Sequence, residues 1–152
     1  MMPLMHNVSG PSDHGQTIVE IIVVVGVAVI LVTALVASST IALKSGQFGK
    51  MKSTAVQYAQ EALEMTRNMR DKSWDDFYTY GDSLPSENWC LDKQGTWTPQ
   101  VISCLVNIDS IYTRTVTFAW QDPQMKVDVV VSWADGAKAY NATLSTYFTQ
   151  WR

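Results

Sequence analysis

The sequence is poor in the side chains that most often carry catalysis or bind metals. Of its 152 residues, two are histidine and two are cysteine, and no histidine follows His14. A zinc site or a nucleophile–base pair needs more of these residues than the later part of the chain supplies. We therefore expect no enzyme, no catalytic residue, no cofactor and no metal site, and we interpret His6 and His14 as solvated side chains.

Positive charge is scarce as well. Met1–Gly15 contains no lysine or arginine, and from Asp71 onward ten acidic residues stand against six basic ones. A protein that binds the phosphate backbone normally carries a basic patch or stripe. The absence of such a patch argues against direct binding of nucleic acid.

Charge is missing altogether from Ile21–Leu43, a run of 23 residues made largely of Val, Ile, Ala and Leu. About 20 apolar residues cross a hydrocarbon core of ~30 Å as a helix. A secretory signal has a shorter apolar region, about 7–15 residues, behind positive charge, and a buried core helix of this length would need a large protein around it. The run predicts a single membrane span, although Lys44, Lys50 and Lys52 behind it would by themselves favour a cytoplasmic C-terminal part.

One carboxylate stands at the N-terminal edge of this run. Glu20 comes five residues after Gly15. A charged side chain at membrane depth costs about 2.5–3.5 kcal/mol on insertion scales, and such a residue is usually functional. The alternative is a glutamate close to the interface, with its side chain directed toward the lipid headgroups.

The segment Gly15-Gln16-Thr17-Ile18-Val19-Glu20, with the apolar run behind it, resembles the processing site of type IV pilins and pseudopilins. The resemblance implies that residues 1–15 are a leader peptide, and that a prepilin peptidase cuts after Gly15 and methylates Gln16. Leaders of this family usually carry Lys or Arg before the glycine, where this chain has Ser12-Asp13-His14. The first mature residue is most often Phe or Met, and Gln16 is similar to the glutamine variants of minor components.

By the same resemblance, the protein is a structural subunit that assembles through its N-terminal helix into a filament. Its partners would be other pilin or pseudopilin subunits, with membrane lipid around the helix before assembly. Glu20 would pair with the amino terminus at Gln16 of a neighbouring subunit, and breaking such a buried pair costs about 3–5 kcal/mol. Gln16, the short head and its aromatic-rich loop favour a minor component.

Several alternatives stay open at this stage. Type IV pilus, type II secretion pseudopilus and DNA-uptake filament are all compatible with the pattern, and each implies a single-pass membrane protein that becomes an extracytoplasmic or cell-surface filament. A different class is a monomeric, signal-anchored membrane protein whose extracytoplasmic β-head binds a partner or a ligand.

Helical periodicity continues beyond the apolar run. Apolar or small residues recur at steps of three and four and define one face: Ala55, Val56, Ala59, Ala62, Leu63, Thr66 and Met69. Together with the apolar run, they predict one helix over residues 16–70. Gly46 and Gly49 mark the place where this helix is free to bend.

The next segment, residues 71–110, is predicted to be a loop because Gly81, Pro85, Gly95 and Pro99 are spread through it. Its first part combines aromatic and acidic residues: Trp74, Phe77, Tyr78 and Tyr80 with Asp71, Asp75, Asp76 and Asp82. This mixture suits a sugar-binding or calcium-binding surface. It suits better a set of aromatic side chains that hold the loop to the preceding helix.

The two cysteines lie in the same segment. Cys90 and Cys104 enclose 13 residues in a part of the chain that would be translocated. An even cysteine count in an oxidising compartment favours a disulfide. Closing a loop of this size stabilises a fold by roughly 3 kcal/mol in the chain-entropy model.

Residues 111–152 predict an antiparallel β-meander, because three apolar-alternating runs are separated by turns at 121–124 and 134–137. The residues expected on its apolar face are Tyr112, Val116, Phe118, Trp120, Val127, Val129, Val131, Trp133, Tyr140, Ala142, Leu144, Thr146 and Phe148. That face should pack against the amphipathic helix. The predicted fold class is α+β, with a leader at 1–15, a helix at 16–70 and a globular head at 71–152.

Overall fold

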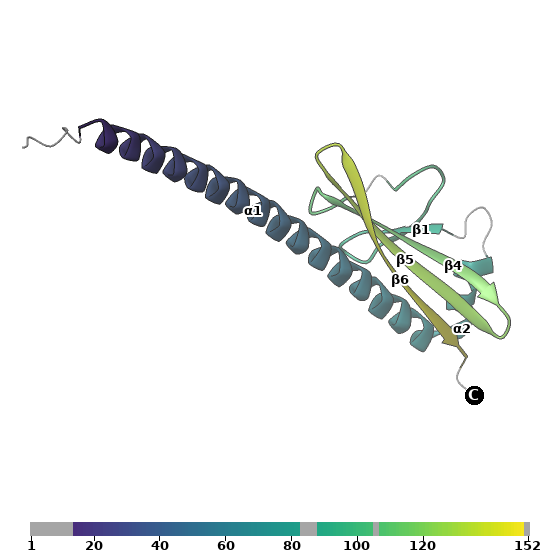
Figure 1. Ribbon diagram of the computed structural model, residues 1–152. Coiled ribbons are helices and arrows are strands. Elements are labelled where there is room, and N and C mark those ends of the chain that lie inside the picture. Colours follow the sequence, from purple (N-terminus) through teal and green to yellow (C-terminus); the bar gives the residue numbers. More distant parts are fainter. Residues whose placement is uncertain (1–13, 83–87, 105–106, 151–152) are drawn as a thin grey trace, which may run out of the picture. The chain divides into compact units, whose positions relative to one another are not determined.

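The computed structural model describes residues 14–82, 88–104 and 107–150 (Figure 1). The chain divides into two compact units, one ending at Ser45 and the other beginning at Gly46. Most of the predicted leader lies outside the described residues.

The first element is α1, a helix of 59 residues over His14–Lys72 that contributes to both units. It confirms the helix predicted over residues 16–70. Gly46 and Gly49 do not interrupt it, although the boundary between the units falls immediately before Gly46. Glycine lowers helix propensity by up to about 1 kcal/mol, which the other residues of a long helix offset.

The prediction of a loop over residues 71–110 was wrong at its start, where helix α2 spans Trp74–Asp82. Ser73 caps the N-terminus of this helix, since its hydroxyl oxygen accepts a hydrogen bond from the main-chain N–H of Asp76 at 3.2 Å. Asp75 and Asp76 place negative charge in the first turn, where the helix dipole favours it.

The strands of the second unit form one antiparallel sheet in the order β2-β1-β4-β5-β6, with β3 also paired to β4. Their bounds are β1 Asn88–Leu91, β2 Trp97–Pro99, β3 Asn107–Ile108, β4 Tyr112–Gln121, β5 Gln124–Asp135 and β6 Lys138–Thr149. The meander β4-β5-β6 confirms the three predicted strands. β1, β2 and β3 correct the predicted loop, and with two to four residues each they are too short to show alternation in the sequence.

Both turns of the meander lie where the sequence places them. Asp122 and Pro123 join β4 to β5, and the Asp122–Pro123 peptide bond is cis. Gly136 and Ala137 join β5 to β6, and Gly136 has a φ of 61°. Glycine adopts this conformation without steric cost, as a two-residue hairpin turn requires.

The core of the second unit lies between α1 and one face of the sheet. Four small residues of α1 are fully buried there: Ala55, Ala59, Ala62 and Thr66. Their short side chains let the helix backbone approach the sheet, which presents Val116, Phe118, Val127, Val129 and Val131 among its buried residues. The helix-on-sheet packing confirms the α+β class and the predicted helix face.

The aromatic residues of α2 pack on the sheet, and not simply against the preceding helix as predicted. The ring of Phe77 is fully buried and lies 5.8 Å from that of Phe118 and 5.5 Å from that of Phe148. Trp120 shares the apolar face of the sheet but remains 38 % exposed, because it lies near the end of β4. Helix α2 packs closely on the sheet at Gly81. A Cβ atom added to this glycine would lie 2.5 Å from the methyl carbon of Met125.

Candidate functional site

The first unit presents a continuous apolar surface. Every large apolar side chain from Ile18 to Leu43 is more than half exposed, and Ile21–Leu43 carries no charged residue. Within the described residues, α1 is the one helix long and apolar enough to cross a membrane. The helix by itself leaves this surface uncovered, and burying it in lipid or against other helices removes the cost of exposing it to water.

The hydroxyl groups of Thr33, Ser39 and Thr40 within this run bond to the helix itself. The Thr33 hydroxyl donates to the carbonyl of Ile30 at 2.9 Å, and the Thr40 hydroxyl donates to that of Val36 at 3.0 Å. Ser39 donates in the same way, to Leu35 at 2.9 Å. These bonds satisfy the hydroxyl donors of the three side chains within the helix, which suits an environment without water.

The predicted processing and assembly residues lie at the start of this helix. Gly15 and Gln16 fall in the first turn of α1, and Glu20 follows one turn later with an exposed side chain. Glu20 is the one acidic residue of α1 before Glu61. The structure therefore places a carboxylate at the edge of an apolar helix surface, where an oppositely charged group could bind it without displacing any protein contact.

In the second unit, Arg114 is a buried residue that the sequence pattern did not reveal. It lies on the apolar face of β4 and is 1 % exposed. Its guanidinium donates to the carbonyls of Tyr58 at 2.9 Å and Leu91 at 3.3 Å, and forms an ion pair with Glu61 at 3.1 Å. Burial lowers the pKa of Arg114, and the hydrogen bond and charge of Glu61 oppose that shift. The side chain joins α1 to β1 across the core.

A second polar cluster joins α1 to two turns. Lys93 lies 2.6 Å from the carboxylate of Asp109, and the hydroxyl of Tyr58 donates to the other oxygen of the same carboxylate. The hydrogen bond from Lys93, followed by that from Tyr58, lowers the pKa of Asp109. Asp109 and Ser110 have φ angles of 50° and 61°, a conformation that aspartate tolerates better than most residues. The cluster holds the β3–β4 turn against the helix.

The predicted disulfide is present. Cys90 of β1 and Cys104 are joined across a sequence separation of 14, and Cys104 lies 3.4 Å from the Thr115 hydroxyl of β4. Cys90 and Thr115 are opposite each other in the strand register. The bond therefore fastens the segment before β3 to the polar face of the sheet. Two apolar side chains of this segment are exposed, Val101 at 80 % and Ile102 at 91 %.

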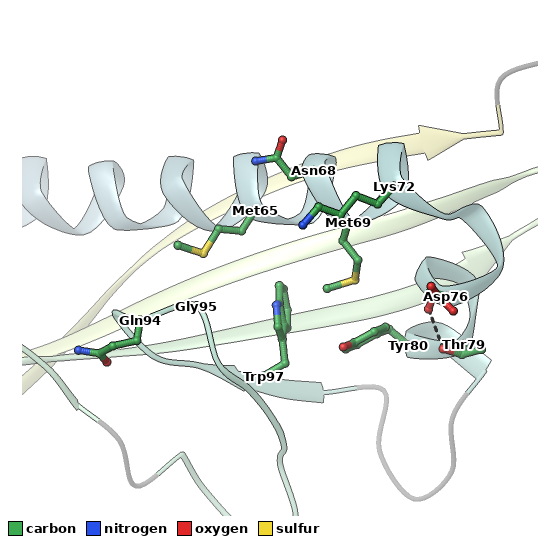
Figure 2. Close-up of a pocket in the computed structure, with 10 residues that line it drawn as sticks. All are labelled: Met65, Asn68, Met69, Lys72, Asp76, Thr79, Tyr80, Gln94, Gly95 and Trp97. Atoms are coloured by element: carbon green, nitrogen blue, oxygen red, sulfur yellow. Dashed lines mark hydrogen bonds between the residues drawn. The ribbon is translucent and has the colours of Figure 1, made fainter.

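A cleft of about 660 Å³ opens between α1, α2 and the β1–β2 hairpin. Its lining residues are Met65, Asn68, Met69, Lys72, Asp76, Thr79, Tyr80, Gln94, Gly95 and Trp97. Figure 2 shows Trp97 directed from the hairpin toward α1, with Met65 and Met69 extending from the helix on either side of it. Among the described residues, no group of His, Cys, Asp and Glu could hold a metal ion.

The sequence showed the aromatic and acidic content of this region but not the cleft, because Trp97 and Gln94 come from a hairpin too short to predict.

Comparison with protein-family models, with curated proteins and with solved structures gives no significant match.

Proposed function

We propose that this protein is a structural subunit of a type IV pilus-like filament, cleaved by prepilin peptidase and assembled through its N-terminal helix. The observation that carries the proposal is Glu20, a carboxylate exposed at the start of a helix surface that is otherwise apolar and uncharged to Leu43. Lipid covers this surface before assembly, and the helices of other pilin or pseudopilin subunits cover it afterwards.

Cleavage after Gly15 gives Glu20 its role. The new amino terminus at Gln16 would be a cation at the end of an apolar helix, and its burial in a bundle of helices is as costly as that of the carboxylate. Pairing Glu20 with the amino terminus of a neighbouring subunit relieves both costs at once. Because the pair forms at one axial offset between the helices, it also sets the register of assembly.

Gln16 at the mature N-terminus and the small aromatic-rich head favour a minor component of the filament. The head of the mature protein is then extracytoplasmic, which agrees with its disulfide. A second candidate function is a monomeric, signal-anchored protein whose head binds a ligand, and the cleft beside Trp97 favours it.

The experiment that tests the proposal is the intact mass of the protein purified from its native membrane or filament. We expect a chain that begins at Gln16 and carries one additional methyl group. The matched control is Gly15→Val, which places a branched side chain at the cut and should retain residues 1–15 if the peptidase recognises the glycine. A wild-type chain that retains its first 15 residues would contradict the filament proposal and leave the anchored protein.

A further inference from the structure

We infer that the cleft between α1, α2 and the β1–β2 hairpin binds a neutral saccharide of two or three pyranose rings, stacked on Trp97. This site lies entirely in the second unit. It does not depend on whether the chain assembles into filaments or remains a monomer, so it goes beyond the proposed function.

Two aromatic neighbours hold Trp97 in a fixed orientation at the cleft. The ring of Trp97 lies 5.6 Å from that of Tyr80 and 5.7 Å from that of Phe118, so two aromatic contacts fix its orientation from behind. The ring is nevertheless only partly buried, and it is directed into the cleft toward α1 (Figure 2). A pyranose presents C–H groups on one face, and these groups pack on the electron-rich face of an indole. A rigidly held, partly open indole is therefore suited to a sugar ring.

The same cleft is also lined by charged and polar side chains. The Lys72 ammonium offers hydrogen-bond donors, the Asp76 carboxylate offers acceptors, and the Tyr80 hydroxyl can do either. Figure 2 shows Lys72 extending along α1 above Trp97, with Asp76 on the neighbouring helix α2. In the described part of the chain, the side chain of Lys72 has no ion pair or hydrogen bond. Its donors are therefore available to a ligand.

The charges argue against a ligand that carries a single net charge. Lys72 and Asp76 have opposite sign, so an anion attracted by one is repelled by the other, and the same holds for a cation. A neutral molecule rich in hydroxyl groups can bond to both. A purely apolar ligand would remove these charges from water without compensation. The volume of about 660 Å³ falls within the range of small-molecule sites and leaves room for more than one sugar ring.

The test uses the full-length chain in a zwitterionic detergent without a sugar headgroup. Cellobiose, maltose, lactose and N,N′-diacetylchitobiose are each titrated to about 20 mM, and binding is followed by saturation-transfer NMR and tryptophan fluorescence. We expect at least one disaccharide to bind with a dissociation constant in the low millimolar range or tighter. Trp97→Ala should weaken that binding by about tenfold or more, and Lys72→Met should weaken it by about threefold or more.

Trp120→Ala is the matched control, because it removes another partly exposed tryptophan outside the cleft and should leave binding unchanged. Since Trp97 also contacts the core, circular dichroism must show that its variant is folded. Lys72→Met tests the site without that concern, because Lys72 is exposed. The inference is overturned if none of the four disaccharides binds, or if Lys72→Met binds as tightly as the wild type. A cysteine placed in the cleft by Gln94→Cys tests whether a second subunit occupies it in filaments. A cross-link between subunits, together with no sugar binding, also overturns the inference, because the cleft is then a subunit contact.

Discussion

Arg114 and Glu61 form an ion pair of 3.1 Å in which the guanidinium side chain is fully buried while the carboxylate side chain is 42 % exposed. The two ends of the pair therefore contribute to the fold in different ways. The guanidinium also donates to the carbonyls of Tyr58, Leu91 and Asp92, whereas water can solvate the carboxylate.

This asymmetry predicts unequal effects of mutation. Arg114→Met keeps most of the side-chain volume but leaves three carbonyls without their donor, so we expect a loss of about 2–4 kcal/mol in the free energy of unfolding. Glu61→Gln leaves those bonds in place and should cost less than about 1 kcal/mol. Urea unfolding of the full chain in detergent micelles, followed by tryptophan fluorescence, measures both. Equal losses for the two variants would contradict the asymmetry.

The close packing of α1 on the sheet gives a second prediction. Ala59 is fully buried among small residues of the helix, and a larger side chain there would push helix and sheet apart. Ala59→Leu should lower the free energy of unfolding by about 1–3 kcal/mol. The control is Gln60→Leu, one position along on the exposed side of the helix, which should change stability by less than about 0.5 kcal/mol. Both values come from the same urea titration.

The Asp109 cluster predicts how stability depends on pH. The pKa of this carboxyl is lowered in the folded state from its ordinary value of 3.8, so its contribution is present above that value and is lost as the pH falls through the lower folded value. Asp109→Asn removes the titrating group while keeping a side chain that tolerates the positive φ. We expect the variant to lose less stability than the wild type between pH 5 and pH 2, measured by thermal unfolding at each pH. Parallel curves for the two proteins would show that Lys93 and Tyr58 do not stabilise the ionised carboxylate.

The disulfide predicts a loss of stability on reduction. Cys90 and Cys104 close a loop with a sequence separation of 14, and opening such a loop costs about 3 kcal/mol through the entropy of the unfolded chain. The double variant Cys90→Ser, Cys104→Ser should show this loss without any reductant. Adding dithiothreitol should then destabilise the wild type but leave the double variant unchanged, and a reductant effect on both would point to another cause.

The assembly role of Glu20 predicts a defect limited to the filament. Glu20→Ala should insert into the membrane and keep a folded head with its disulfide, but its incorporation into filaments should fall by at least about tenfold. The control is Glu64→Ala, since Glu64 is an exposed glutamate on the same helix but in the second unit. Immunoblots of sheared filaments and of membranes measure both pools. Normal incorporation of the Glu20 variant would support the anchored monomer instead.

The elements with a long, regular residue pattern could be predicted from local sequence alone. The uncharged run to Leu43 defined the candidate membrane span, the spacing of Ala55, Ala59 and Ala62 defined the helix face, and alternation over 10 to 12 residues defined β4, β5 and β6. The pairing of the two cysteines followed from their number and spacing. In each case the residue types and their regular spacing along the chain are sufficient to predict the feature.

The remaining features depend on contacts between distant parts of the chain. Strands β1 to β3 are too short for a period to form, and helix α2 has only nine residues, so packing on the sheet stabilises these elements more than their own sequence preference does. Arg114 carries a charge that a pattern would assign to the surface, and it is buried because partners from distant parts of the chain meet it. The cleft exists because Trp97 and Lys72, 25 positions apart, are brought to one place by the fold.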